Sequence, residues 1–240
     1  MKLLTFPDHP ELDGRHAPFP ASSPSWLNYD EDRLKIKFQN DARKELGTEL
    51  HAFAASSIKL MDKLTKNKYE VIRCFKSYLK GKYDKGEDSD ISEEEKNRSY
   101  KHLLNLYQAM DFLPDRVWLT LVLYINDACS YHMTPERHLF YSWNFFGTAD
   151  SIGYDVTDHI LRIHDLKTGD TPAKFEQLYI YAALACLEHK LNVDNISIEL
   201  RIYQNGNRID EKADITKVKQ IIDIIKRDDR IWKDMTVGGR

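Results

Sequence analysis

The spacing of apolar residues changes near Thr134, and this change limits what the chain can fold into. Between residues 39 and 66, apolar positions recur every three or four residues, as they do on a helix with one buried face, and further helical stretches follow up to residue 131, interrupted by a charged, exposed loop between Lys80 and Ser92. After Thr134, short segments rich in Phe, Tyr, Trp, Ile and Leu are broken by Gly and Asp, which is typical of strands separated by turns. The pattern predicts helices first, and then strands with helices among them.

Capping and turn residues place the expected elements. Ser92 and Glu95 form the S-x-x-E pattern that caps a helix start. Thr171 followed by Pro172 predicts another helix start, and Asn205-Gly206 predicts a hairpin turn. The expected helices cover residues 39–66, 67–80, 93–112, 115–131 (with a strand as the alternative), 171–190 and 214–227. The expected strands lie near residues 137–146, 148–155, 160–167 and 195–203.

Composition excludes several classes of protein. With 42% hydrophobic and 30% charged residues over 240 positions, the chain is neither disordered nor collagen-like. Its longest apolar runs reach about half of the ~20 residues that a membrane span needs, and Pro7 and Asp8 end the first apolar stretch too early for a signal peptide. We therefore expect a cytoplasmic protein that does not contact membranes. Its net charge of −3 means that nucleic-acid binding must depend on a local groove.

Two acids and a lysine fall on neighbouring expected strands. If a tight turn is centred between Thr157 and Asp158, paired positions sum to 315, which places Asp150 opposite Asp165. Lys167, two residues beyond Asp165, then points to the same face. Opposed carboxylates destabilise a sheet unless a cation neutralises them, and Mg²⁺ or Mn²⁺ prefers such oxygen ligands. The alternative is an exposed ion pair of Asp165 with Lys167, and a turn capped by Asp150.

Two four-residue spacings accompany these acids. Gly47 and His51 lie one turn apart on the first expected long helix, where the glycine would let another backbone approach. Gln177 and Tyr181 show the same spacing on the helix that follows Lys167. Taken singly, each pair has a structural alternative, namely a structural histidine and an ordinary half-buried helix face.

Together these residues resemble the motif set of a known nuclease family. Gly47-x-x-x-His51, Gly147-Thr148-Ala149-Asp150, Asp165-Leu166-Lys167 and Gln177-x-x-x-Tyr181 follow one another in the order of RecB-type nucleases of the PD-(D/E)XK superfamily. Similar proteins are the CRISPR-associated RecB-like exonucleases and standalone phage-encoded nucleases. The motifs span residues 47–181. Ala149 stands where the superfamily's name has proline, as is common in this branch.

The resemblance implies a fold and a domain organisation. It implies an α/β protein with a restriction-endonuclease-like central mixed β-sheet flanked by helices, and a single nuclease domain over residues 1–240. Residues 1–30, which hold five of the eight prolines, would form an irregular lead-in. A helical insertion over about 67–131 and a catalytic sheet with C-terminal helices over 132–240 would complete the domain.

The resemblance also implies the roles of the site residues. Mg²⁺ or Mn²⁺ would be held by His51, Asp150, Asp165 and the backbone carbonyl of Leu166. Lys167 would assist the attacking water, and Gln177 and Tyr181 would shape the site and contact the DNA backbone. Glu136, at the start of the strand that leads to Asp150, weakly matches an acid often seen there. An iron–sulfur cluster, usual in the CRISPR-associated relatives, is not expected because the chain has three cysteines and the cluster needs four.

The implied activity is metal-dependent hydrolysis of DNA. We expect an exonuclease on single-stranded or end-resected DNA, acting in recombination, replication or repair, as a phage enzyme would in the host cytoplasm. The chain lacks a Walker A motif, so unwinding would need a helicase or recombination partner, or a substrate that is already open. A structure-specific endonuclease, and a nuclease-fold protein that binds DNA or a partner with a vestigial site, remain alternatives.

Basic and aromatic residues around the motifs suggest DNA contacts. Candidates for phosphates, or for an ordinary solvated helix face, are Arg33, Lys35, Lys37, Arg43, Lys44, Lys59, Lys63, Lys66 and Lys68. Candidates for base stacking, or for core packing, are Trp26, Tyr141, Trp143 and Phe146.

Overall fold

The computed structural model describes residues 17, 19–21, 24–86, 88 and 90–237. The chain divides into two compact units, Met1–Asp41 and Ala42–Arg240, and the boundary falls inside helix α1 (Glu31–Lys59). Much of the expected lead-in, including Pro7 and Asp8, lies outside the described residues. The expected single domain over 1–240 stays a prediction. Among the described residues, no helix combines the length and apolarity that crossing a membrane requires.

The first unit contains a short 3-10 helix, η2 (Pro24–Asn28), and the first turns of α1. The indole N–H of Trp26 donates to the carbonyl of Pro20, and the ring packs edge-on against Phe19. Lys37 binds Asp41 one turn further along α1. Trp26 is therefore engaged in local packing, and Lys37 is paired within its own helix.

Helices form the first half of the second unit. The rest of α1 is followed by α2 (Lys68–Tyr83), α3 (Glu93–Ala109), the 3-10 helix η3 (Met110–Phe112) and α4 (Asp115–Ser130). The capping box of Ser92 and Glu95 is confirmed, and α4 is a helix rather than the alternative strand. Leu46, Leu50 and Phe53 of α1 enter a core built with these helices. Their three- and four-residue spacing is the reason that this face of α1 is buried.

The first helix ends earlier than its periodicity predicts. The apolar spacing predicts a helix to residue 66, but α1 stops at Lys59: Met61 takes a left-handed φ of 55°, and the N–H of Asp62 donates to the carbonyl of Ser57, which closes the helix end. The backbone N–H and C=O of Leu64 both bind the side-chain amide of Asn126 on α4, each at 2.8 Å. A backbone engaged in this way cannot continue the helical hydrogen-bond ladder.

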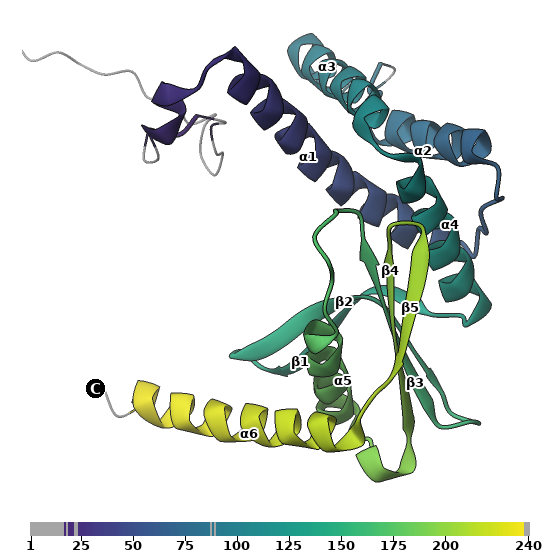
Figure 1. Cartoon of the computed structure of the whole chain (residues 1–240), viewed down its shortest axis with the longest axis vertical. Helices are drawn as coiled ribbons and strands as arrows, with labels where there is room; N and C mark the ends of the chain where they lie inside the picture. The colour runs from purple at the N-terminus through teal and green to yellow at the C-terminus, as the bar shows by residue number, and fades with distance from the viewer. Residues whose placement is uncertain (1–16, 18, 22–23, 87, 89, 238–240) are drawn as a thin grey trace, which may run out of the picture. The chain divides into compact units, whose positions relative to one another are not determined.

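A five-stranded mixed sheet forms the second half of the unit (Figure 1). Its order follows the chain: β1 (Thr134–Ser142), β2 (Phe145–Asp155), β3 (Ile160–Lys167), β4 (Ser197–Gln204) and β5 (Asn207–Lys212). Only β3 and β4 pair in parallel, across α5 (Glu176–His189). The turn predicted at Asn205-Gly206 is confirmed, with φ of 54° and 74° at its two residues. The protein is thus α/β with a mixed sheet flanked by helices.

Helix α5 crosses β1, β2 and β3 and carries a second core (Figure 1). Its alanine- and leucine-rich face packs on Leu139, Ala149 and Ile163 of these strands. The last helix, α6 (Ile215–Val237), packs beside α5 and runs ten residues past the expected end at 227.

Two further sequence-based boundaries are wrong. The break between the first two strands lies at Trp143-Asn144 and not at Gly147, because Asp229 of α6 accepts hydrogen bonds from the side chains of Ser142 and Asn144. Helix α5 begins at Glu176 and not after Thr171. The amide of Gln204 donates to the carbonyls of Gly169 and Thr171, which holds this segment as a loop.

Candidate metal-binding site

A cleft of about 960 Å³ opens in the second unit, lined by residues of α1, α5 and strands β1 and β2. His51, Glu136 and Asp150 line it, together with Gln177 and Tyr181 of α5. Its other lining residues include the cations Arg43, Lys44 and Arg116 and the acids Asp111 and Asp170. The cleft thus joins a cluster of acids to basic side chains.

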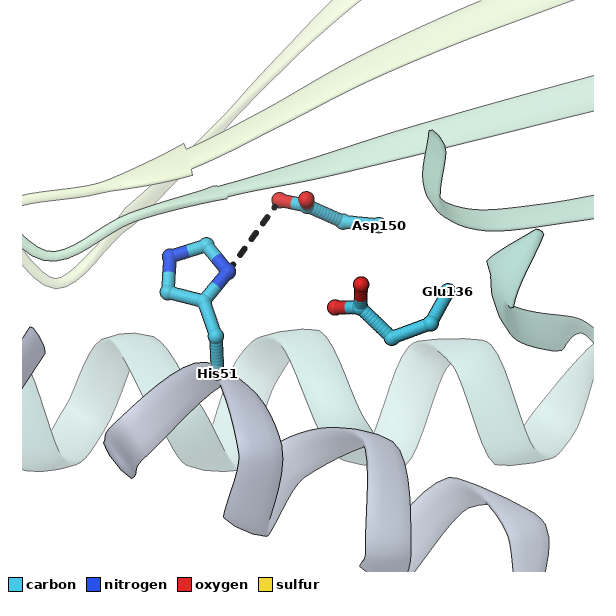
Figure 2. Close-up of side chains that lie close together, drawn as sticks. All are labelled: His51, Glu136 and Asp150. Carbon is cyan, nitrogen blue, oxygen red and sulfur yellow. Dashed lines mark ion pairs between the residues drawn. The ribbon is translucent and has the colours of Figure 1, made fainter. Parts of the chain in front are cut away.

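Three side chains of metal-ligand type converge in this cleft. One ligand atom from each of His51, Glu136 and Asp150 lies within 4.8 Å of the other two. Figure 2 shows the imidazole of His51 extending from α1 toward Asp150, with the carboxylate of Glu136 beside them. The Nδ1 atom of His51 is 3.6 Å from Oδ2 of Asp150. Three separate elements therefore supply the cluster.

The register of β1 and β2 brings the two acids of this cluster together. Pro135 pairs with Ser151 and Arg137 pairs with Ala149, so Glu136 lies opposite Asp150. Glu136 has a φ of 49°, the left-handed region that a residue with a long side chain seldom adopts. Strained backbone of this kind persists only where surrounding contacts impose it, and it is concentrated at functional sites.

Asp150 is anchored by the neighbouring strand. The backbone N–H of Leu166 donates to its Oδ2 at 2.8 Å. Burial nevertheless raises the pKa of Asp150 from 3.8 to about 6, because the Leu166 hydrogen bond and the charge of Lys167 offset the desolvation only in part. Burial also lowers the pKa of His51, although Glu136 and Asp165 oppose this shift, so the imidazole is neutral at pH 7.

Asp165 and Lys167 form a second cluster beside the first. The Nζ atom of Lys167 is 3.0 Å from each carboxylate oxygen of Asp165 and donates to Oε1 of Gln177 at 3.3 Å. Gln177 in turn donates to the hydroxyl of Tyr181 at 2.7 Å. The ammonium is therefore held between β3 and α5.

Asp165 is short of hydrogen bonds for a buried carboxylate. Its side chain is 4% exposed, and Oδ2 makes no hydrogen bond with any described residue despite its ion pair with Lys167. Burial and the nearby charge of Asp150 raise its pKa to about 6. The Lys167 ammonium, 3.0 Å from Oδ2, is the positive charge that compensates this buried carboxylate.

Gly47 and Gly147, the glycines of the two motifs, lie where a side chain would overlap a residue that lines the cleft. A Cβ at Gly47 would come within 3.0 Å of Oγ1 of Thr168, the residue after Lys167. A Cβ at Gly147 would come within 2.9 Å of the Tyr181 ring. The glycines therefore let α1 approach the end of β3 and let Tyr181 lie on β2.

The structure brings the sequence-predicted residues together, with differences in their arrangement. The hairpin register is confirmed by the pair Ile152 and Ile163, and one further step past Ser151 and His164 places Asp150 opposite Asp165. The ion pair of Asp165 with Lys167 is present, but Asp165 is buried rather than exposed, and Asp150 accepts the backbone N–H of Leu166 on the neighbouring strand. Asp165 lies outside the cluster of three, and Glu136, only weakly matched in the sequence, is inside it.

Some of the basic residues predicted to contact phosphates line the cleft, and others are paired elsewhere. Arg43 and Lys44 line the cleft, whereas Lys63 donates to Ser130 and Lys68 pairs with Asp115 on the helical side of the unit. In the first unit, Lys35 pairs with Glu31.

Compared with protein-family models, curated proteins and solved structures, the chain has no match, so the interpretation of the cleft depends on its own residues.

Proposed function

We propose that the protein is a metal-dependent deoxyribonuclease that hydrolyses phosphodiester bonds in this cleft. The observation that carries the proposal is the convergence of His51, Glu136 and Asp150 next to the buried pair of Asp165 and Lys167. Acids grouped around a metal, with a cation beside them, suit displacement at phosphorus because negative charge develops on the phosphoryl oxygens. The mixed sheet and its flanking helices are compatible with the proposed restriction-endonuclease-like fold.

The residues present fit Mg²⁺ or Mn²⁺. Carboxylate oxygens are the ligands that these ions prefer, and a neutral imidazole suits Mn²⁺ better than Mg²⁺. Glu136, Asp150 and His51 would hold the ion, with Asp165 and the carbonyl of Leu166 as further ligands. In a strand, the N–H and C=O of one residue point to the same side, so the Leu166 carbonyl points to the side of β2, as its N–H does.

When bound, the ion would supply positive charge against the phosphate oxygens. Lys167 adds a second positive charge at a fixed position, because Asp165 and Gln177 hold its ammonium from two elements. In this place it can orient the attacking water and stabilise the charge that develops on the phosphate. Tyr181 keeps Gln177 in place, and Arg43 and Lys44 contact the DNA backbone at the rim.

We further propose that the substrate is single-stranded DNA or a DNA end, processed by an exonuclease in recombination, replication or repair. A helicase or recombination partner would supply unwinding where the substrate is duplex. The proposed compartment is the cytoplasm, that of the host for a phage enzyme.

The test is digestion of end-labelled linear single-stranded and double-stranded DNA in Mn²⁺, Mg²⁺ or EDTA. We compare the wild type with Asp150→Asn and Lys167→Met, using Asp155→Asn in the same strand as the matched control. Cleavage should need the metal, fall at least about a hundredfold in the two site variants and persist in the control. Absence of cleavage by the wild type with either metal would refute the proposal.

The products separate the remaining alternatives. Covalently closed ends block an exonuclease, whereas cutting of circular single strands would identify an endonuclease. DNA binding without cleavage under either metal would instead indicate a binding protein with a vestigial site.

A further inference from the structure

We propose that the exposed aromatic side chains of the β1–β2 hairpin form a stacking surface for unpaired bases of a DNA strand that leads into the cleft. We call Phe140, Trp143 and Phe146 the aromatic platform. The inference rests on the proposed function for the direction of the strand, but its binding step can be tested without cleavage.

The platform continues the row of cross-strand pairs that starts at the acids. Glu136 and Asp150 form one cross-strand pair of β1 and β2. Two positions further along the hairpin, His138 pairs with Thr148, and two positions beyond these, Phe140 pairs with Phe146. The intervening residues Leu139 and Ala149 pack into the core with α5, so His138, Thr148 and the two phenylalanines face the opposite side.

The platform residues are exposed far more than core packing would leave them. Phe146 is 65% exposed and Phe140 is 42% exposed, while Trp143 in the turn is 87% exposed. The rings of Phe140 and Trp143 contact each other edge-on with centroids 5.5 Å apart. Tyr141, the other aromatic candidate here, instead packs against the second core.

The turn that carries Trp143 is held in place. Its neighbours Ser142 and Asn144 both donate hydrogen bonds to Asp229 of α6, at 2.7 and 2.9 Å, and Lys233 pairs with the same carboxylate. A stacking side chain on a fixed turn loses less freedom on binding than one on a mobile loop. The platform is therefore preorganised by a helix distant in sequence.

The row of cross-strand pairs leads from the platform to the acids through uncharged or basic side chains. The pair between them is His138 and Thr148, joined by a hydrogen bond of 2.8 Å, and Thr148 itself lines the cleft. Asp150 lies four positions after Phe146, or about 14 Å along an extended strand. Arg43 and Lys44 line the same cleft and supply the charge that a phosphate backbone needs.

These features favour single-stranded DNA over other occupants. Every unpaired base offers a flat face to an aromatic ring, whereas paired bases are stacked within the duplex and present phosphates instead. Continuity with a cleft that combines metal-ligand and basic residues favours a phosphate-bearing polymer over an apolar protein surface.

The experiment measures binding of a fluorescent 20-nucleotide oligothymidylate by anisotropy in EDTA, where no cleavage occurs. The variants are Trp143→Ala, Phe146→Ala and their combination, with Trp143→Phe as the conservative rescue. Tyr69→Ala is the matched control, because Tyr69 is 79% exposed on α2 and does not line the cleft. Circular dichroism and thermal melting verify that each variant is folded.

We expect each alanine variant to bind roughly tenfold more weakly, the combination weaker still, and Trp143→Phe and Tyr69→Ala nearly as tightly as the wild type. Binding of a blunt hairpin duplex should be unchanged by all of them. If the double variant binds oligothymidylate like the wild type, or the wild type does not bind it, the inference is wrong.

Sedimentation velocity then tests whether a second copy of the chain covers the platform instead. Failure of the nuclease proposal would appear separately, as intact platform-dependent binding without metal-dependent cleavage.

Discussion

Replacing Asp150 by asparagine should stabilise the metal-free protein at pH 8. The Asp150 side chain is 20% exposed, and the amide oxygen of the introduced asparagine can still accept the N–H of Leu166, so the substitution mainly removes the charge. Burial raises the pKa of Asp150 from 3.8 to about 6. Because the folded pKa lies above the unfolded value, the carboxyl favours folding below pH 4 and loses this contribution as the pH rises through about 6.

The size of the effect follows from these two values. Each tenfold difference in proton affinity is worth about 1.4 kcal/mol, so the ionised carboxylate costs the folded state about 3 kcal/mol above pH 7. For a unit of this size, that corresponds to an increase in melting temperature of about 6–12 °C. Most of the increase should be lost near pH 4, where the folded-state carboxyl is protonated, and the rest should disappear below the unfolded pKa of 3.8, where both states are protonated.

The assay is thermal unfolding followed by circular dichroism, in EDTA and in Mn²⁺, at pH 4 and pH 8. Mn²⁺ should stabilise the wild type at pH 8 and leave Asp150→Asn nearly unchanged, since a ligand stabilises only the state that binds it. Asp155→Asn is the matched control on β2. Hydrogen bonds from the backbone N–H groups of Asp158 and Thr157 lower the pKa of Asp155, so its removal should not stabilise the protein at pH 8. An Asp150→Asn variant no more stable than the wild type in EDTA at pH 8 would refute the reasoning.

Three further predictions concern single contacts. Lys167→Met should abolish cleavage but keep the rise in melting temperature that Mn²⁺ causes, because the ammonium is not a ligand of the ion. Loss of this rise would mean that the lysine mainly supports Asp165. Glu136→Gln should weaken the Mn²⁺-dependent shift, measured by titrating the metal, and an unchanged affinity would exclude Glu136 as a ligand. Gly147→Ala should destabilise the protein by about 1–3 kcal/mol, because its Cβ meets the Tyr181 ring at 2.9 Å. Urea unfolding measures this cost, and a neutral result would show that the ring moves freely.

Local patterns in the sequence were sufficient for much of the fold. The capping box at Ser92, the turn at Asn205-Gly206 and the register of the β2–β3 hairpin depend on residues close together in the chain. Such interactions act over one turn or one pair of strands, so the residue types alone report them. The same holds for Asp150, Asp165 and Lys167, whose relative placement follows from one tight turn and the alternation of strands.

What only the tertiary structure decided depends on contacts between distant segments. Gln204 binds the carbonyl of Thr171 in the segment where a helix was expected, and Asp229 accepts a hydrogen bond from Asn144 in the turn at Trp143. Glu136 joins the cluster because β1 pairs with β2 at one register and α1 brings His51 to the same place. The sequence by itself determined which chemical groups are available and their local geometry. Which of them share a buried, low-dielectric space is decided by packing, because desolvation and the proximity of charges arise only when the core has formed.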